Sequence, residues 1–235
     1  MNDAQRLMIL AAAVADEVRS GMVVGLGTGA TADAVIHELG RRVATGLAIV
    51  GVPTSLRTER LAQEVGISLT TLNDVARIDL GFDGADEINP SLDAVKGRGG
   101  ALLHEKLVAL ACDDYMLVAS AEKFVSRLGT RLPLPVEVIP FGWQHTATRI
   151  SKLGGEPILR TDPNAPETPA TSDGGHFLLD CAFGPIGDPA ALAAALKATT
   201  GVVDHGLFVG LAQRVIGVEP DGSIRRLNRV SWDNR

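Results

Sequence analysis

Residues 22–31 read MVVGLGTGAT, an apolar run that leads directly into a glycine-rich loop. Residues 31–43 then place apolar side chains at helical spacing, so we expect a strand, a loop and a helix in that order. The runs 47–52, 78–82 and 115–119 are also apolar or β-branched, and 56–65 and 101–112 again have helical spacing. Strands that alternate with helices over short connections predict an α/β fold with a parallel sheet between helices.

The flanking segments extend this prediction. Residues 4–19 are expected to form an opening helix, and residues 215–218 and 224–227 a closing hairpin around Asp221 and Gly222. Between them, from about Leu128, prolines force an extended stretch over 132–140. Helices at 143–153 and 189–198, with strands at 177–181 and 202–208, then predict a small α+β domain.

The composition excludes several classes of protein. The chain has 235 residues, 46% hydrophobic and 21% charged, with a net charge of −6, which is typical of a globular protein and disfavours nucleic acid as a partner. No apolar run approaches the roughly 18 residues that cross a bilayer, so no membrane contact is expected. Residues 8–15 superficially resemble a signal peptide, but charged residues continue the helical pattern.

The two cysteines, Cys112 and Cys181, show neither a CxxC motif nor metal-ligand spacing. They are expected to be reduced thiols of a cytoplasmic protein, and the sequence leaves a disulfide between them open.

The glycine loop predicts an anion site formed by Thr28, Gly29, Ala30 and Thr31. Backbone N–H groups at the start of a helix bind phosphate, and glycines allow a close approach. The loop also fits the dinucleotide fingerprint, but the second strand ends in VPTS without the acidic residue which that fingerprint requires. A tight turn without any ligand is the remaining alternative.

The sequence DGADE (83–87) follows the third predicted strand. The carboxylates of Asp83 and Asp86, joined by Gly84 and Ala85, could hold magnesium, act in acid–base catalysis or cap a turn. The nearby Lys96 argues against a metal, because its ammonium supplies positive charge itself. We therefore expect acid–base chemistry and no metal site.

A second glycine loop, KGRGG (96–100), contains Lys96, Gly97, Arg98 and Gly99 and precedes the helix that carries Glu105. Glu105 alone could be an exposed helix residue, and Lys123, in ASAEK after the fourth strand, a surface lysine. Nearly all these polar segments fall at predicted carboxyl ends of strands, where ligands bind to open α/β sheets. This convergence favours one shared site.

The motifs GLGTGAT, PTS, DGADEI, KGRGGALLHEK, ASAEK, LPLPVEVIPF, KLGGEPILR and GVVDHGLF, in this order, closely resemble ribose-5-phosphate isomerases of the A type. The resemblance implies a Rossmann-like parallel-sheet domain (1–128 plus 208–235) and a smaller inserted α+β, ferredoxin-like domain (129–207) that takes part in oligomerisation. It also implies a cytoplasmic, cofactor-independent homodimer or homotetramer of the non-oxidative pentose phosphate pathway.

Carried over residue by residue, the resemblance implies that Glu105 is the general base, with Asp83, Lys96 and Asp86 as its catalytic partners. The sugar phosphate would bind at residues 28–31, 83–86 and 96–99 and at Lys123. The implied reaction interconverts ribose 5-phosphate and ribulose 5-phosphate through an enediol. The alternatives are a non-catalytic sugar-phosphate sensor and an enzyme like the acyl-CoA transferases with a glutamate nucleophile.

The chain departs from the family pattern at four positions. Arg98 replaces a glycine, Gly100 an alanine, His104 an arginine and Ala30 a serine. The loss of the serine hydroxyl costs about 1 kcal/mol, or up to about 3 if the bond is charge-assisted. Arg98 is expected either to point to solvent or to contact the substrate anion.

Overall fold

The computed structural model describes residues 1–229, and the chain divides into two compact units. The first unit contains Met1–Ala85, Leu107–Lys123 and the described part of Gly210–Arg235, and the second contains Asp86–Lys106 and Phe124–Val209. This division differs from the predicted domains, which keep residues 86–106 in the large domain. The last residues of that predicted domain, 230–235, lie outside the described part.

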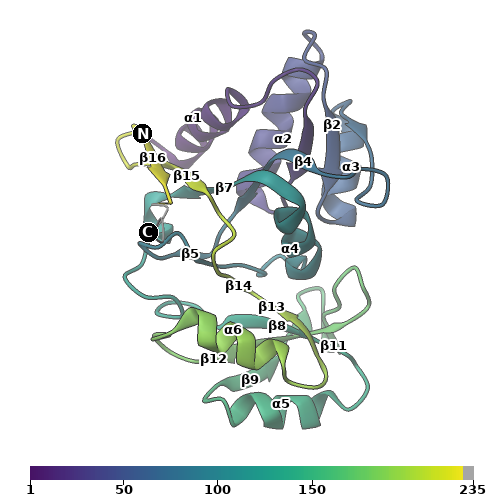
Figure 1. The fold of residues 1–235 in the computed structure, drawn as a ribbon, viewed down its shortest axis with the longest axis vertical. Coiled ribbons are helices and arrows are strands. Elements are labelled where there is room, and N and C mark those ends of the chain that lie inside the picture. Colours follow the sequence, from purple (N-terminus) through teal and green to yellow (C-terminus); the bar gives the residue numbers. More distant parts are fainter. Residues whose placement is uncertain (230–235) are drawn as a thin grey trace, which may run out of the picture. The chain divides into compact units, whose positions relative to one another are not determined.

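The first unit is built on a mainly parallel sheet, drawn in Figure 1. Over residues 1–229 its strand order is β16-β15-β7-β4-β1-β2-β3, and only the β15–β16 pair is antiparallel. The strands are β1 (Val23–Leu26), β2 (Val50–Pro53), β3 (Ser68–Leu69), β4 (Ile78–Gly84), β7 (Cys112–Ser120), β15 (Arg214–Val218) and β16 (Ile224–Asn228). The order reverses between β1 and β4, which is where open α/β sheets bind ligands.

The helices of this unit are α1 (Asp3–Ala15), α2 (Ala30–Val43), α3 (Leu56–Glu64), the second half of α4 (Leu102–Ala111) and the 3-10 helix η1 (Ala121–Lys123). Successive strand residues face opposite sides of the sheet. Val24 and Leu26 therefore pack into the core shared with α1 and α2, whereas Gly25 faces α4. A Cβ atom at Gly25 would lie 2.7 Å from Cγ1 of Val108, so glycine is what allows α4 to pack this closely.

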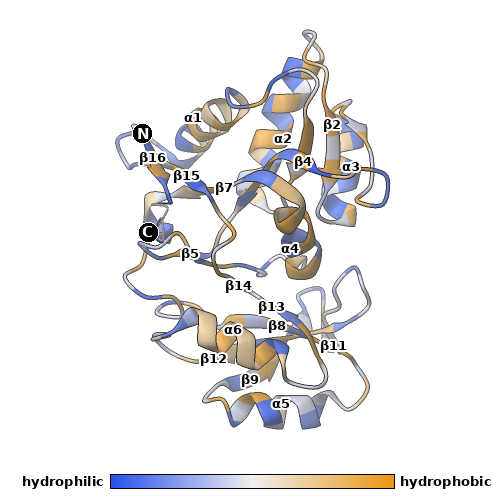
Figure 2. Ribbon diagram, in the orientation of Figure 1, coloured by the Kyte–Doolittle hydropathy of each residue, from blue (hydrophilic) through white to orange (hydrophobic). Residues whose placement is uncertain are grey.

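The second unit contains an antiparallel sheet of order β13-β8-β12-β9 with two helices. Its elements follow in the order β8 (Leu134–Val138), α5 (Trp143–Ser151), β9 (Glu156–Leu159), β12 (Phe177–Ala182), α6 (Pro189–Lys197) and β13 (Val202–His205). This is the ferredoxin-like arrangement of the resemblance. Asp188 caps α6 by accepting the N–H of Ala191 at 3.0 Å, and Figure 2 shows the alanine-rich α6 largely in hydrophobic colours.

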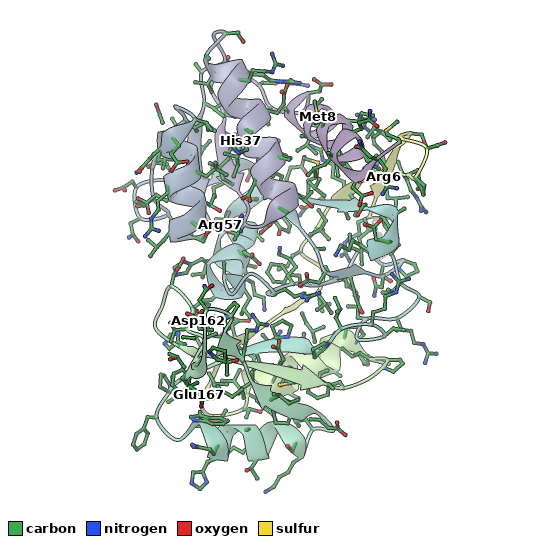
Figure 3. The ribbon with its side chains drawn as sticks, turned by 180° about the vertical axis from the view of Figure 1, so that it is seen from behind. Arg6, Met8, His37, Arg57, Asp162 and Glu167 are labelled. Atoms are coloured by element: carbon green, nitrogen blue, oxygen red, sulfur yellow. The ribbon has the colours of Figure 1, made fainter. Side chains whose placement is uncertain are left out.

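Two smaller sheets complete the second unit. The strands β5 (Glu87–Ile88), β6 (Ala94–Val95) and β14 (Leu207–Phe208) form one, in the order β14-β6-β5. The strands β10 (Thr161–Asp162) and β11 (Ala165–Pro169) form a hairpin, on which Figure 3 labels Asp162 and Glu167. The pairing of β5 and β6 with β14 is the reason that residues 86–106 belong to this unit.

The predicted α/β fold class is confirmed, and the corrections concern element boundaries. The opening helix ends at Ala15 rather than at residue 19, and Cys112 begins β7 instead of ending the helix before it. The predicted strand over 202–208 is divided into β13 and β14 at Gly206. Cys112 and Cys181 are both free thiols, so the disulfide alternative is wrong. Within residues 1–229, no helix is long and apolar enough to span a bilayer.

Candidate active site

Asp83 lies at the carboxyl end of β4, with its side chain 1% exposed, and is held against the glycine loop of β1. One carboxylate oxygen accepts the backbone N–H groups of Thr28 at 3.1 Å and Gly84 at 2.7 Å. A Cβ atom at Gly27 would lie 2.4 Å from this carboxylate, so the loop needs glycine there to reach Asp83. The first unit thus joins two of the predicted site segments.

The hydroxyl of Thr28 forms hydrogen bonds with other side chains of the protein. It shares hydrogen bonds with the hydroxyls of Thr54 at 2.7 Å and Thr58 at 2.9 Å, and it donates to Ser55 at 2.8 Å. Thr28 is 8% exposed and Thr58 is fully buried. These bonds fix the glycine loop to the end of β2 and the start of α3.

The start of α2 offers backbone groups to an anion. Its N-cap residue is Gly29, whose φ of 118° favours glycine, and no side chain caps the first turn. Ala30 is exposed and Thr31 is half-buried. A Cβ atom at Gly84 would lie 3.8 Å from Cβ of Thr31, which places Gly84 beside this turn. Lys123, the last residue of η1, is also half-buried.

The second unit brings Lys96 and Glu105 together in a buried ion pair. Lys96 directly follows β6, and Glu105 lies in the first turn of α4. Nζ of Lys96 is 3.2 Å from Oε2 of Glu105, and each side chain is only 3% exposed. Burying a charge is costly unless it is paired, so this pair supports a functional interpretation of both residues.

The loop between these two residues is held by its glycines and by Arg160. Gly97 and Gly100 have φ values of 107° and 81°. Nη1 of Arg160 donates to the carbonyls of Gly97 at 3.0 Å and Arg98 at 3.1 Å, while the same guanidinium binds both carboxylate oxygens of Asp180. Arg160 was not predicted as a site residue, because these partners are distant from it in the chain.

Two of the residues that break the family pattern, Arg98 and His104, lie in this loop and in the helix that follows it. Arg98 is exposed, and its backbone N–H donates to Oδ2 of Asp86 at 3.3 Å. It borders a cavity of about 450 Å³ in the second unit, together with Gly99, Arg160 and Asp180. His104 is half-buried and borders a much smaller cavity with Glu137 and Ser172.

A buried network beside Glu105 was not predicted. Lys106 pairs with Oδ1 of Asp204 and donates to the carbonyl of His205 at 2.6 Å, and Lys197 donates to Oδ2 of Asp204 at 2.8 Å. Burial raises the pKa of Asp204, but the Lys106 ammonium and the hydrogen bonds to the carboxylate outweigh this and hold the pKa at about 2. Asp204 is therefore ionised at neutral pH.

For Lys106 and His205, burial is the largest cause of the pKa shift. Burial lowers the pKa of Lys106 from its ordinary 10.5, and the charge of Asp204 offsets part of this effect. Burial and the Lys106 ammonium lower the pKa of His205 to about 4, so its ring is neutral at pH 7. Its Nδ1 accepts the N–H of Leu207 at 3.2 Å, which assigns that nitrogen as the unprotonated one.

Glu87, the last carboxylate of the DGADE segment, has a structural role. It is fully buried and accepts the backbone N–H groups of Gly129 at 2.6 Å, Arg131 at 2.7 Å and Leu132 at 3.1 Å. Among residues 1–229, no group of three or more histidine, cysteine, aspartate or glutamate side chains could hold a metal ion.

The arrangement suits proton transfer at carbon. Within the second unit, the buried Glu105 carboxylate can accept a proton, and the adjacent Lys96 ammonium can stabilise negative charge that develops on oxygen. The fold and these residues define a Rossmann-like α/β class with a ferredoxin-like second unit and a buried lysine–glutamate pair.

Comparison with known proteins identifies the family within that class. The sequence model described as Ribose 5-phosphate isomerase A (phosphoriboisomerase A) matches residues 50–222. Ribose-5-phosphate isomerase A of Synechococcus sp. (strain JA-3-3Ab) is 50% identical over 214 residues, which cover 90% of this chain and 92% of the relative. The chain belongs to the ribose 5-phosphate isomerase A family.

Solved structures agree with this assignment. A D-ribose-5-phosphate isomerase in complex with phospho-erythronic acid is 34% identical, with a TM-score of 0.94 and coverage of 97% of this chain and 100% of that chain. The ribose 5-phosphate isomerase A of Methanocaldococcus jannaschii is 33% identical, with a TM-score of 0.90 and the same two coverages. These comparisons do not support the sensor alternative.

Proposed function

We propose that this chain is an aldose–ketose isomerase that interconverts D-ribose 5-phosphate and D-ribulose 5-phosphate through an enediol. The observation that carries the proposal is the buried pair of Lys96 and Glu105 at 3.2 Å, in a chain of this family. The relative that binds phospho-erythronic acid, a phosphorylated acid, supports a phosphorylated ligand for this chain as well.

In the proposed reaction, Glu105 removes the proton from C2 of the open-chain aldose. The C2–H electrons form the C1=C2 bond of the enediol, and the C1 carbonyl oxygen takes up a proton. Glu105 then returns its proton to C1 while the O2 proton leaves, so the step needs no oxidant or reductant. Lys96 would stabilise the charge that develops on oxygen, which is usually the largest catalytic contribution.

The remaining residues have supporting roles in the proposal. Asp83 would carry the hydroxyl proton, first during opening of the furanose ring. Asp86 would orient Lys96 or bind a sugar hydroxyl. The phosphate would bind the N–H groups of residues 28–31 and Lys123. The exposed Ala30 and the φ of Gly29 support an anion at this helix start.

The experiment is conversion of ribose 5-phosphate by the purified protein, with and without EDTA. We expect ribulose 5-phosphate to form at the same rate in both samples. A protein that binds ribose 5-phosphate saturably without converting it would instead be a sensor. A covalent thioester trapped on Glu105 with an acyl-CoA would indicate the transferase alternative. Either outcome would overturn the proposal.

We further propose that the chain acts in the cytoplasm, in the non-oxidative pentose phosphate pathway, as a homodimer or homotetramer to which residues 129–207 contribute. Two observations in the second unit support an interface there. Phe141 is 90% exposed, and Ile158 is 69% exposed on β9, which is an edge strand. Light scattering of the wild type and of Ile158→Lys would test it: we expect a larger species that the substitution weakens, whereas a monomeric wild type would contradict the proposal.

A further inference from the structure

Two lysine ammonium groups of the second unit lie near one aromatic ring. Phe208, in β14, is 1% exposed. Its ring centroid lies 5.4 Å from Nζ of Lys96 and 5.1 Å from Nζ of Lys106. Both distances are within the roughly 6 Å over which an ammonium is attracted to the negative face of a ring.

The two lysines differ in their other partners. Lys106 is anchored by the Asp204 carboxylate and the carbonyl of His205, so its position is set by hydrogen bonds. Lys96 pairs with Glu105, the residue that we propose to change its charge during the reaction. When Glu105 takes up a proton, Lys96 loses the charge of this partner while it remains buried.

A ring is well suited to support a cation in this situation. A second carboxylate would attract the ammonium away from the reacting atoms and would cancel its charge. A phenyl ring attracts the ammonium without accepting a proton, and its attraction does not change when Glu105 is protonated. Lys96 can then keep its N–H donors directed to other groups.

The ring is also fixed in place relative to Lys96. The backbone N–H of Lys96 donates to the carbonyl of Gly206 at 2.9 Å, and Leu207 pairs with Val95 in the small sheet. A Cβ atom at Gly206 would lie 2.1 Å from the carbonyl oxygen of Lys96, so glycine allows the two segments to meet.

We propose that Phe208 is a positioning residue, whose ring holds the Lys96 ammonium beside Glu105 throughout the proton transfer. This inference rests on the proposed isomerase function. It assigns importance for catalysis to residues 206–208 (GLF), although these residues contribute no group that reacts.

The test is a fluorination series at position 208, with 4-fluoro-, 3,5-difluoro- and 3,4,5-trifluorophenylalanine. Each fluorine weakens the negative face of the ring and leaves its shape nearly unchanged. We expect kcat to fall stepwise, by about tenfold at three fluorines, as a cation–π interaction of this burial suggests. KM and the thermal midpoint should stay close to those of the wild type. The same series at Phe183, which packs against the core of this unit, is the matched control and should leave kcat unchanged.

A kcat that stays constant along the series at 208 would overturn the inference. Because Lys106 faces the same ring, the series is repeated with Lys106→Met. If kcat still falls with fluorination in the Lys106→Met background, the effect belongs to Lys96. If kcat no longer falls, that assignment is overturned. An inactive wild type would contradict the proposed function, whereas an active wild type with a flat series would contradict only the role of Phe208.

Discussion

His205 is a buried residue beside the pair of Lys106 and Asp204. His205 is 5% exposed, and its Nδ1 accepts a hydrogen bond from the backbone of Leu207. A proton on this nitrogen would remove that bond and would place a second positive charge beside Lys106. This is why the pKa of His205 is lowered to about 4, with burial as the largest cause.

This pKa shift predicts a pH dependence of stability. The unfolded chain binds a proton at His205 near pH 6.5, and the folded chain does so only near pH 4. Between these values the unfolded state holds more protons, so stability must fall as the pH falls from 6.5 to 4, by about 3 kcal/mol for this residue. Urea unfolding of the wild type and of His205→Asn at several pH values measures it, and the variant should lose less stability over that range.

His37→Asn is the control for this prediction. His37 is exposed on α2, as Figure 3 shows, so its removal should leave the pH dependence unchanged. If His205→Asn loses as much stability between pH 6.5 and 4 as the wild type, another group is responsible.

At the scale of elements, the loop between β6 and α4 depends on a residue from β9 and β10. Arg160 lies between these two strands and donates to two loop carbonyls, in addition to its bidentate pair with Asp180. A lysine cannot make this forked set of bonds, because its ammonium is a single point of charge.

We therefore expect Arg160→Lys to lower kcat, by about tenfold to a hundredfold, since small displacements of catalytic groups have effects of that size. The exposed Arg149 of α5 gives a matched control, Arg149→Lys, which should keep full activity. Steady-state kinetics and thermal melting of both variants would decide. An Arg160→Lys enzyme with normal kcat would show that the loop does not need this anchor.

Long, periodic elements could be predicted from the sequence, and short ones could not. The strands at 78–82 and 115–119 and the helices at 31–43 and 189–198 are confirmed as β4, β7, α2 and α6, because each has a repeating apolar pattern. The strands β5, β6 and β14 have two residues each and therefore no period. Their pairing, which joins residues distant in the chain, was not predictable.

The same limit applies to the site. Thr28, Asp83 and Lys96 were predicted because they lie in glycine-rich segments at predicted ends of strands, and Glu105 was predicted because the resemblance implies that it is the base. Lys106, Asp204 and Phe208 were missed because their contacts connect residues about a hundred positions apart, as in the pair of Lys106 and Asp204. The roles of the predicted residues in binding and catalysis stay predictions.

At the scale of the whole molecule, the two thiols report on the folded state. The pKa of Cys112 and that of Cys181 are both raised to about 12. Burial is the largest cause, and the negative charge of nearby aspartates raises each pKa further. Almost no thiolate is then present at neutral pH, and the thiolate is the reactive form. Native protein should therefore react slowly with Ellman's reagent, and protein in guanidinium should react rapidly at both cysteines.

Cys112→Ser would show which thiol accounts for any residual reaction of the native protein, because Cys112 is half-buried and Cys181 is buried. Rapid reaction of Cys181 in the native state would contradict its burial in the hydrophobic core of the second unit.

The central claim is that Glu105 is the base that transfers the proton between C2 and C1. The most direct test is kcat for ribose 5-phosphate of the wild type, of Glu105→Gln, and of Glu64→Gln, an exposed glutamate at the end of α3. Glutamine keeps the shape of the side chain but cannot accept the proton, so we expect turnover to fall by roughly 10²–10⁴-fold or more in Glu105→Gln and to stay normal in Glu64→Gln. A Glu105→Gln enzyme that folds and retains near-normal turnover would contradict the account.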